Sequence, residues 1–143
     1  MTYEELLADG KIDDAVVAYV ERNQHVSYPE LIRLLGPYMR VEGDMVTGPR
    51  EFGEVVFWVG MSEEFVDLIS RLTLAGRIHG HPAHLLEYMI DGGLLRIPIA
   101  KAARFYKKPH WFPIVFCTYQ LGEGGRKRRV EKMPHCVGLF VLG

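Results

Sequence analysis

The order of the secondary structure expected along this 143-residue chain constrains its fold more than any other sequence feature. Apolar residues recur at helical spacing three times before Gly76, whereas the later part holds short runs of aromatic and β-branched residues that are typical of strands. No repeat with a period of about 20 to 50 residues is visible. We therefore expect a single α+β domain over residues 1–143.

The first two helices have recognisable ends. Apolar spacing predicts a helix over residues 12–23, with Asp13 and Asp14 in its first turn, where the helix dipole favours acidic side chains. Ser27 and Glu30 have the spacing of a capping box and predict a second helix, which ends near Gly36 or continues to residue 39.

Ser62 predicts the start of a third helix, which is expected to end at Gly76. Its apolar residues share one face, and they are Phe65, Leu68, Ile69 and Leu72. Residues 41–54 contain three glycines and a proline, so we expect an irregular excursion there.

The remaining apolar runs are short and are expected to be extended. The expected strand segments are residues 55–59, a hairpin of residues 77–83 with 84–91 that turns at 80–83, an extended stretch at 94–100, and a strand at 111–121 that pairs antiparallel with 129–142.

The segments SYPELIRLLG and SEEFVDLISRLTLAGRIHGHPAHLLEYMIDG carry a resemblance to a winged helix-turn-helix domain, over about residues 11–91. The resemblance implies a winged-helix-like three-helix portion with a wing hairpin. Residues 92–143 would then be a basic, β-rich extension, with an additional C-terminal antiparallel hairpin packed on that portion. The chain departs from the pattern because a long insertion at about residues 40–61 separates the second helix from the third.

The third helix, which the resemblance would make the DNA-reading one, has an acidic start. Glu63, Glu64 and Asp67 would face phosphates, and Arg71 alone is basic among its early exposed positions. Insertion of this helix into the major groove is therefore disfavoured, and these four residues fit a contact with another protein better.

The charge is divided unequally along the chain, although the net charge is only −1. Residues 1–91 contain 16 acidic and 7 basic residues, a net charge of −9, whereas residues 92–143 contain 2 acidic and 10 basic residues, a net charge of +8. The basic part therefore either meets an acidic partner or neutralises the acidic part of its own chain.

Two basic clusters are candidate contact sites for nucleic acid or a partner. A glycine-flanked turn carries Arg126, Lys127, Arg128 and Arg129, with Lys132 beyond them. A second cluster is interleaved with Phe105, Tyr106, His110 and Trp111, and it consists of Lys101, Arg104, Lys107 and Lys108.

Metal binding and catalysis are not expected. The histidines His79, His81 and His84 lack an acidic or thiol ligand within their motif. His110, Cys117, His135 and Cys136 are a second possible ligand set, but the adjacent His135 and Cys136 would point to opposite faces of a strand and could not both bind one metal ion. No phosphate-binding glycine loop, nucleophilic serine motif or paired acid and base is present, so we expect neither an enzyme nor a cofactor.

No apolar run is long enough to span a bilayer, the first residues are acidic, and two cysteines are too few for a disulfide framework, so we expect a cytoplasmic protein without a membrane partner. The expected function is that of a transcription-associated regulatory protein, which contacts DNA or an acidic surface of the RNA polymerase and transcription-factor machinery through its basic C-terminal hairpin. The alternative is a non-transcriptional protein interaction module, an adaptor or inhibitor, on a winged-helix fold.

Overall fold

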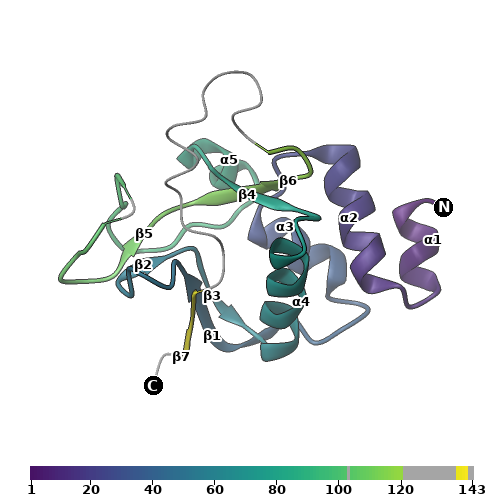
Figure 1. Ribbon diagram of the computed structural model, residues 1–143, viewed down its shortest axis with the longest axis horizontal. Coiled ribbons are helices and arrows are strands. Elements are labelled where there is room, and N and C mark those ends of the chain that lie inside the picture. The colour runs from purple at the N-terminus through teal and green to yellow at the C-terminus, as the bar shows by residue number, and fades with distance from the viewer. Residues whose placement is uncertain (103, 121–137, 142–143) are drawn as a thin grey trace.

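The computed structural model describes residues 1–102 and 104–120 and the backbone of residues 138–141 (Figure 1). The helices are α1 (Tyr3–Ala8), α2 (Ile12–Asn23), α3 (Tyr28–Leu35), α4 (Glu63–Leu74) and α5 (Leu85–Ile90). The strands are β1 (Glu42–Gly48), β2 (Val55–Val56), β3 (Trp58–Met61), β4 (His79–Pro82), β5 (His110–Trp111), β6 (Ile114–Cys117) and β7 (Gly138–Val141). This combination of helices with short, mostly antiparallel strands confirms the α+β class.

The three expected helices are present as α2, α3 and α4. The hydroxyl of Ser27 accepts a hydrogen bond from the backbone N–H of Glu30 at 3.2 Å, and the hydroxyl of Ser62 accepts one from Phe65 at 3.0 Å. Each serine satisfies an N–H group that has no partner within its helix. The capping box expected at Ser27 is only half formed, because the Glu30 carboxylate instead accepts a hydrogen bond from the hydroxyl of Tyr19.

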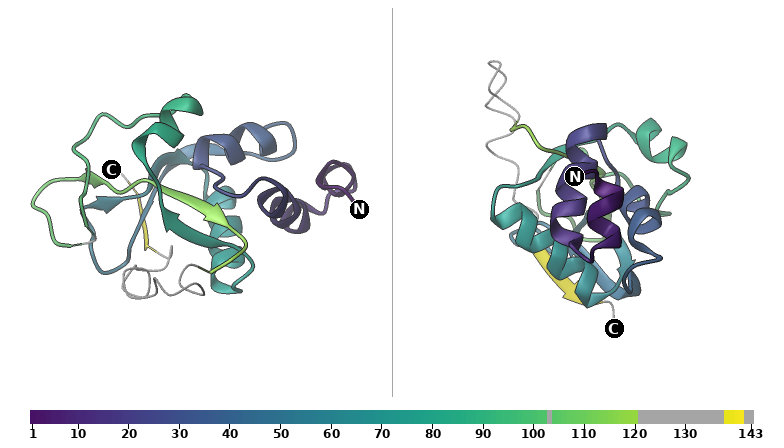
Figure 2. Two further views of the ribbon diagram at one scale, coloured as in Figure 1. Left: turned by 90° about the horizontal axis from the view of Figure 1, so that it is seen from above. Right: turned by 90° about the vertical axis from the view of Figure 1, so that its right-hand side faces the viewer.

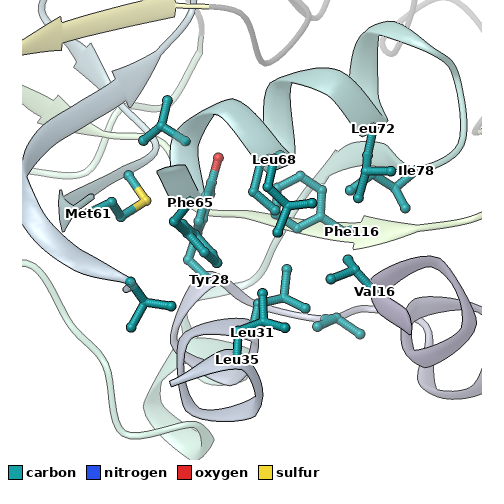
Figure 3. Close-up of a cluster of buried hydrophobic side chains, with 14 of the residues drawn as sticks. Val16, Tyr28, Leu31, Leu35, Met61, Phe65, Leu68, Leu72, Ile78 and Phe116 are labelled. Atoms are coloured by element: carbon teal, nitrogen blue, oxygen red, sulfur yellow. The ribbon is translucent and has the colours of Figure 1, made fainter. Parts of the chain in front are cut away.

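Helices α2, α3 and α4 surround one hydrophobic core (Figure 3). The apolar face of α4 is buried as its spacing predicts, and each fully buried aliphatic side chain stabilises the fold by about 1.5–3 kcal/mol. The core side chains labelled in Figure 3 come from these helices and from the strands beside them, and they are Val16, Tyr28, Leu31, Leu35, Met61, Phe65, Leu68, Leu72, Ile78 and Phe116.

A small antiparallel sheet lies beside the three helices. Strand β6 pairs with β4 along one edge, and Phe116 at its other edge exchanges two backbone hydrogen bonds with Val26, at 2.8 and 3.0 Å (Figure 1). Val26 lies between α2 and α3, so the pairing joins the connection between these helices to a strand about 90 residues later in the sequence.

Two of the expected strand pairings are wrong. Residues 84–91 do not pair with 77–83, because His84 and Glu87 form a reciprocal cap that begins helix α5. Residues 138–141, the described part of the segment 129–142, do not pair with 111–120 either, since they form β7 beside β1 and both edges of β6 are occupied. Residues 121 and 129–137 lie outside the described residues. The antiparallel partner of β4 is therefore β6, which follows it after a connection that contains α5 and β5.

The expectation of an irregular excursion at residues 41–54 is wrong for residues 42–48, because they form β1, which pairs with β3 and β7. Residues 49–54 contain neither helix nor strand. A register shift between Glu42 and Met45 hides the usual alternation of apolar and polar residues. Gly43 lies so close to the neighbouring backbone that a Cβ atom would be 2.6 Å from the carbonyl oxygen of Met61. Helix α1, which we did not expect, is begun by a capping box of Thr2 and Glu5.

The expected strands at 55–59 and 111–121 are each divided in two. Val55 and Val56 of β2 pair in parallel with β5, whereas β3 turns to join β1. The connection between α5 and β5 extends to the end of the molecule opposite α1 and α2 (Figure 2). Among the described residues, no helix has both the length and the apolar character to cross a bilayer.

Candidate functional site

Residues 92–102 and 104–120 of the basic extension are described, and backbone hydrogen bonds attach them to the core. The backbone N–H of Trp111 donates to the carbonyl of Pro98, and the N–H of Ala100 donates to the carbonyl of Trp111, both at 2.7 Å. Trp111 is fully buried, and its indole N–H donates to the carbonyl of Phe57 at 3.0 Å. Both ends of the connection between Ala100 and His110 are therefore attached to the core.

Aromatic side chains within this connection contact one another. Phe105 is 81% exposed, and its ring makes a T-shaped contact with that of Phe52, with 4.9 Å between ring centroids. The ring of Tyr106 stacks on His110 at 4.0 Å, and the guanidinium carbon of Arg104 lies 5.1 Å from the Tyr106 centroid. The aromatic residues of the cluster therefore share contacts on the surface instead of entering the core, except for Trp111.

The cations of this connection are exposed, and we call the surface formed by Lys101, Arg104, Phe105, Tyr106, Lys107 and Lys108 the basic loop. None of its four cations takes part in an ion pair within the described part of the chain. Partial burial raises the pKa of Tyr106, but the hydrogen bond and positive charge of Arg104 outweigh it, with help from backbone groups, and lower that pKa.

The cations beside helix α4 are bound differently. Arg71 donates two hydrogen bonds to the carboxylate of Asp13, and Arg77 donates one to Asp14 at 2.8 Å. The pKa of Arg71 is raised, mainly by its hydrogen bonds to Asp13. These pairs join α4 and the turn after it to α2.

The exposed face of α4 consequently has an acidic character. Glu63, Glu64 and Asp67 are exposed, and none of them has an ion-pair partner among the described residues. Arg71 is occupied by Asp13, so it offers little free positive charge to a phosphate. The exposed charge at the start of this helix is therefore mainly negative, which is unfavourable beside phosphates.

The other expected cluster, Arg126, Lys127, Arg128, Arg129 and Lys132, lies outside the described residues. His135 and Cys136 also lie outside them.

The structure brings together a polar cluster that the sequence reasoning did not assemble. His81 is buried on the face of the β4 and β6 pair, and its ring meets Tyr119 with 5.1 Å between centroids. The hydroxyl of Tyr119 lies 3.1 Å from Nε2 of His25, whose Nδ1 is 3.5 Å from a Glu87 carboxylate oxygen. The sequence spacing of His79 and His81 places both on one strand face, but it carries no sign of His25 or Tyr119.

This cluster does not gather metal ligands. His84 is separated from His79 and His81 by its role as the N-cap of α5, where its Nδ1 accepts a hydrogen bond from Leu86 at 3.1 Å. Within residues 1–102 and 104–120, no three His, Cys, Asp or Glu side chains are placed to hold a metal ion.

A shallow groove of about 220 Å³ lies beside the basic loop. It runs between the end of β4, the start of α5 and the residues before β6, and Lys101 stands at its border. The lining is mainly apolar, and it is formed by Pro82, Ala83, His84, Leu85, Ile99, Ala100, Lys101, Phe112 and Pro113.

Comparison with known proteins shows no family model that matches the chain, and no curated protein or solved structure that matches it.

Proposed function

We propose that this protein is a transcription-associated regulatory binding protein, which contacts DNA or an acidic surface of the transcription machinery through cations of its C-terminal part. The observation that carries the proposal is the contrast between two groups of cations. Arg71 and Arg77 are held by the chain's own carboxylates, whereas the four cations of the basic loop are exposed and unpaired within the described residues. Charges left unpaired in this way are available to a polyanionic partner.

The arrangement of elements supports the resemblance on which the transcriptional part of the proposal rests. Helices α2, α3 and α4 form one core, and two antiparallel strands, β4 and β6, follow the third helix. The wing of a winged helix would then be the connection from β4 to β6, which contains the basic loop. The contact with a partner would be made from this wing instead of from the acidic α4.

The experiment measures association of the full chain with a duplex DNA fragment and with purified RNA polymerase at increasing salt. We expect binding to at least one of them, with an affinity that falls steeply as salt rises, by about 0.9 in log–log slope for each duplex phosphate neutralised. The double reversal Lys107→Glu with Lys108→Glu removes this binding. Its matched control reverses two exposed cations of another surface, Lys11→Glu with Arg22→Glu.

Binding to neither partner overturns the proposal. Retention of binding in the Lys107 and Lys108 double variant, with loss only when Arg126, Lys127, Arg128 and Arg129 are all changed to Glu, moves the contact away from the basic loop and contradicts its stated role.

A second candidate function, a non-transcriptional protein interaction module, is favoured by the apolar surface of α5. Ile90 is 84% exposed, and Leu86 and Met89 are each more than half exposed on the same short helix. The apolar groove starts at the same helix. Exposed apolar groups gathered in this way mark contact surfaces for proteins. A partner bound here would show little salt dependence, which separates this candidate from the first.

A further inference from the structure

We propose that Phe105 is a stacking platform for an unpaired base, and that the basic loop thereby binds single-stranded nucleic acid. The proposal rests on the proposed function, since it uses the same cations, and it names the chemical class of the polyanion. Proteins that bind single strands without sequence preference combine cations that follow the phosphates with aromatic side chains on which bases stack. The basic loop contains both groups within eight residues.

The exposure of Phe105 is the first step of the argument. The Phe105 ring is 81% exposed, so most of its apolar area stays in water and its burial contributes little to the stability of the fold. Phe52 meets the ring in a T-shaped contact, with planes inclined at 71°, and most of the Phe105 side chain remains exposed beside this contact. A base can therefore lie on the open face of Phe105.

The neighbouring cations are placed for phosphates. Arg104 precedes Phe105, and Lys107 and Lys108 follow it within three residues, so exposed positive charge flanks the platform along the chain. The Tyr106 ring contacts both the Arg104 guanidinium and the stacked His110, and so links two parts of the loop. The carbonyl of Lys108 lies 2.7 Å from Nδ1 of His110, and the N–H of His110 donates to the carbonyl of Glu54 at 2.7 Å. The platform is thus carried on a loop whose base is already fixed, which lowers the entropy lost on binding.

The geometry favours a single strand over a duplex. Bases are read in the major groove by a helix or a two-stranded ribbon, and residues 104–109 form neither. An aromatic side chain that enters a duplex must unstack base pairs, which costs a few kcal/mol and is compensated by wrapping DNA over a large protein surface. An unpaired base is reached without this cost, so one exposed ring is sufficient.

The test uses the full chain and a fluorescein-labelled oligothymidylate, with fluorescence anisotropy as the readout. Thymine is a fair probe because stacking on an aromatic ring tolerates every base. We expect Phe105→Ala to weaken binding about tenfold or more and Phe105→Trp to retain it. Tyr38→Ala, which removes another exposed aromatic side chain, is the matched control and leaves affinity unchanged. Thermal unfolding of each variant verifies that it folds as the parent does.

The lysines give a second, independent readout. Lys107→Gln with Lys108→Gln should reduce the log–log salt slope by about 1.4, since each contact with a single-strand phosphate contributes about 0.7. A duplex of equal length should bind more weakly than the oligothymidylate. Equal or tighter binding of the duplex assigns the loop to double-stranded DNA and overturns the single-strand proposal.

The failure of this inference is distinguishable from the failure of the proposed function. Unchanged oligothymidylate affinity in Phe105→Ala, or no affinity at low salt, overturns the platform. If duplex DNA or polymerase still binds through Lys107 and Lys108 in that case, the proposed function stands and the partner is a duplex or an acidic protein. If oligothymidylate binding depends on Phe105 but the chain associates with neither duplex DNA nor polymerase, the stacking role of Phe105 stands and the transcriptional role is overturned.

Discussion

Arg71 of α4 and Asp13 of α2 form a two-pronged ion pair, with Nη2 to Oδ1 at 2.9 Å and Nε to Oδ2 at 3.2 Å. The pair joins two helices across 58 residues of sequence, and it places a carboxylate against the one cation of the early α4 face. The face that remains is acidic. This ion pair is one reason why we propose that a polyanion contacts the basic loop instead of α4.

The ion pair should make only a small contribution to stability. Both side chains are partly exposed, at 57% for Arg71 and 40% for Asp13, and solvent screens such pairs. We expect Arg71→Ala to lower the free energy of unfolding by about 0.5–1 kcal/mol, with a coupling to Asp13→Ala of similar size in a double-mutant cycle. Chemical denaturation measures both. The same Arg71 variant should bind duplex DNA and oligothymidylate as the parent does, and a loss of binding would return α4 to the contact surface.

Two leucines of α4 provide a comparison of burial on one helix. Leu68 is 1% exposed within the core, whereas Leu74, in the last turn, is 71% exposed. Leu68→Ala removes buried apolar atoms and leaves a cavity, so we expect a loss of about 3 kcal/mol in the free energy of unfolding. Leu74→Ala should change it by less than about 0.5 kcal/mol. Urea denaturation of the two variants measures the difference, and similar losses in both would contradict the assigned burial.

The local signals of the sequence were sufficient for α2, α3 and α4, because a cap and an apolar stripe lie within a few residues of each other. They failed for β1, which depends on distant partners, and for α5, whose local cap is of an unusual kind. Strand β1 contains Gly43 and a register shift that only the approach of Met61 explains. Residues 84–91 are a short apolar run that fits a strand or a helix equally, and the cap that decides the matter is a histidine, an unusual residue in that position.

In the candidate site, too, the sequence predicted local features and missed those that arise only when the elements pack. The sequence predicted the cations of the basic loop and the acids of α4, because charge is read directly from composition. It did not predict which cations are neutralised, since Arg71 finds Asp13 only after the helices pack. The cluster around His81 was missed for the same reason, because His25 and Tyr119 are 94 residues apart in the sequence and meet only in the folded chain.

The stability of the protein should depend on pH through His81. Burial lowers the pKa of this histidine from its ordinary value of 6.5, and the nearby His79 and His25 lower it further. The folded chain therefore keeps His81 neutral at a pH where the unfolded chain binds a proton. The free energy of unfolding should be unaffected well above pH 6.5 and should fall as the pH decreases through 6.5 toward the folded pKa.

The measurement is urea denaturation at several pH values from about 5 to 8. His81 contributes a slope of at most about 1.4 kcal/mol per pH unit, and His81→Leu should remove that contribution. His84→Asn, which alters an exposed histidine and preserves the cap of α5, is the control and should retain the parent profile. Identical pH profiles for the parent and His81→Leu would show that His81 titrates normally.

The backbone of the turn between α2 and Val26 predicts that glycine is a more stable substitution than alanine at Gln24. Gln24 has φ of +52° and ψ of 163°, a conformation that favours glycine, and its side chain compensates for the strain through Thr118. The side-chain amide donates to the Thr118 hydroxyl at 2.8 Å, and its oxygen accepts from the Thr118 N–H at 2.9 Å. Gln24→Ala removes both hydrogen bonds and keeps the strain, whereas Gln24→Gly removes the hydrogen bonds and relieves the strain.

Both variants should therefore lower the free energy of unfolding, but Gln24→Gly by about 1 kcal/mol less than Gln24→Ala. At an ordinary position the order is the reverse, because glycine has more conformational freedom in the unfolded chain. Asn23, in the last helical turn of α2, provides the matched pair, and Asn23→Gly should be less stable than Asn23→Ala. Thermal and urea denaturation of the four variants test the reversal. If alanine is the better residue at both positions, the backbone of Gln24 carries no strain that glycine relieves.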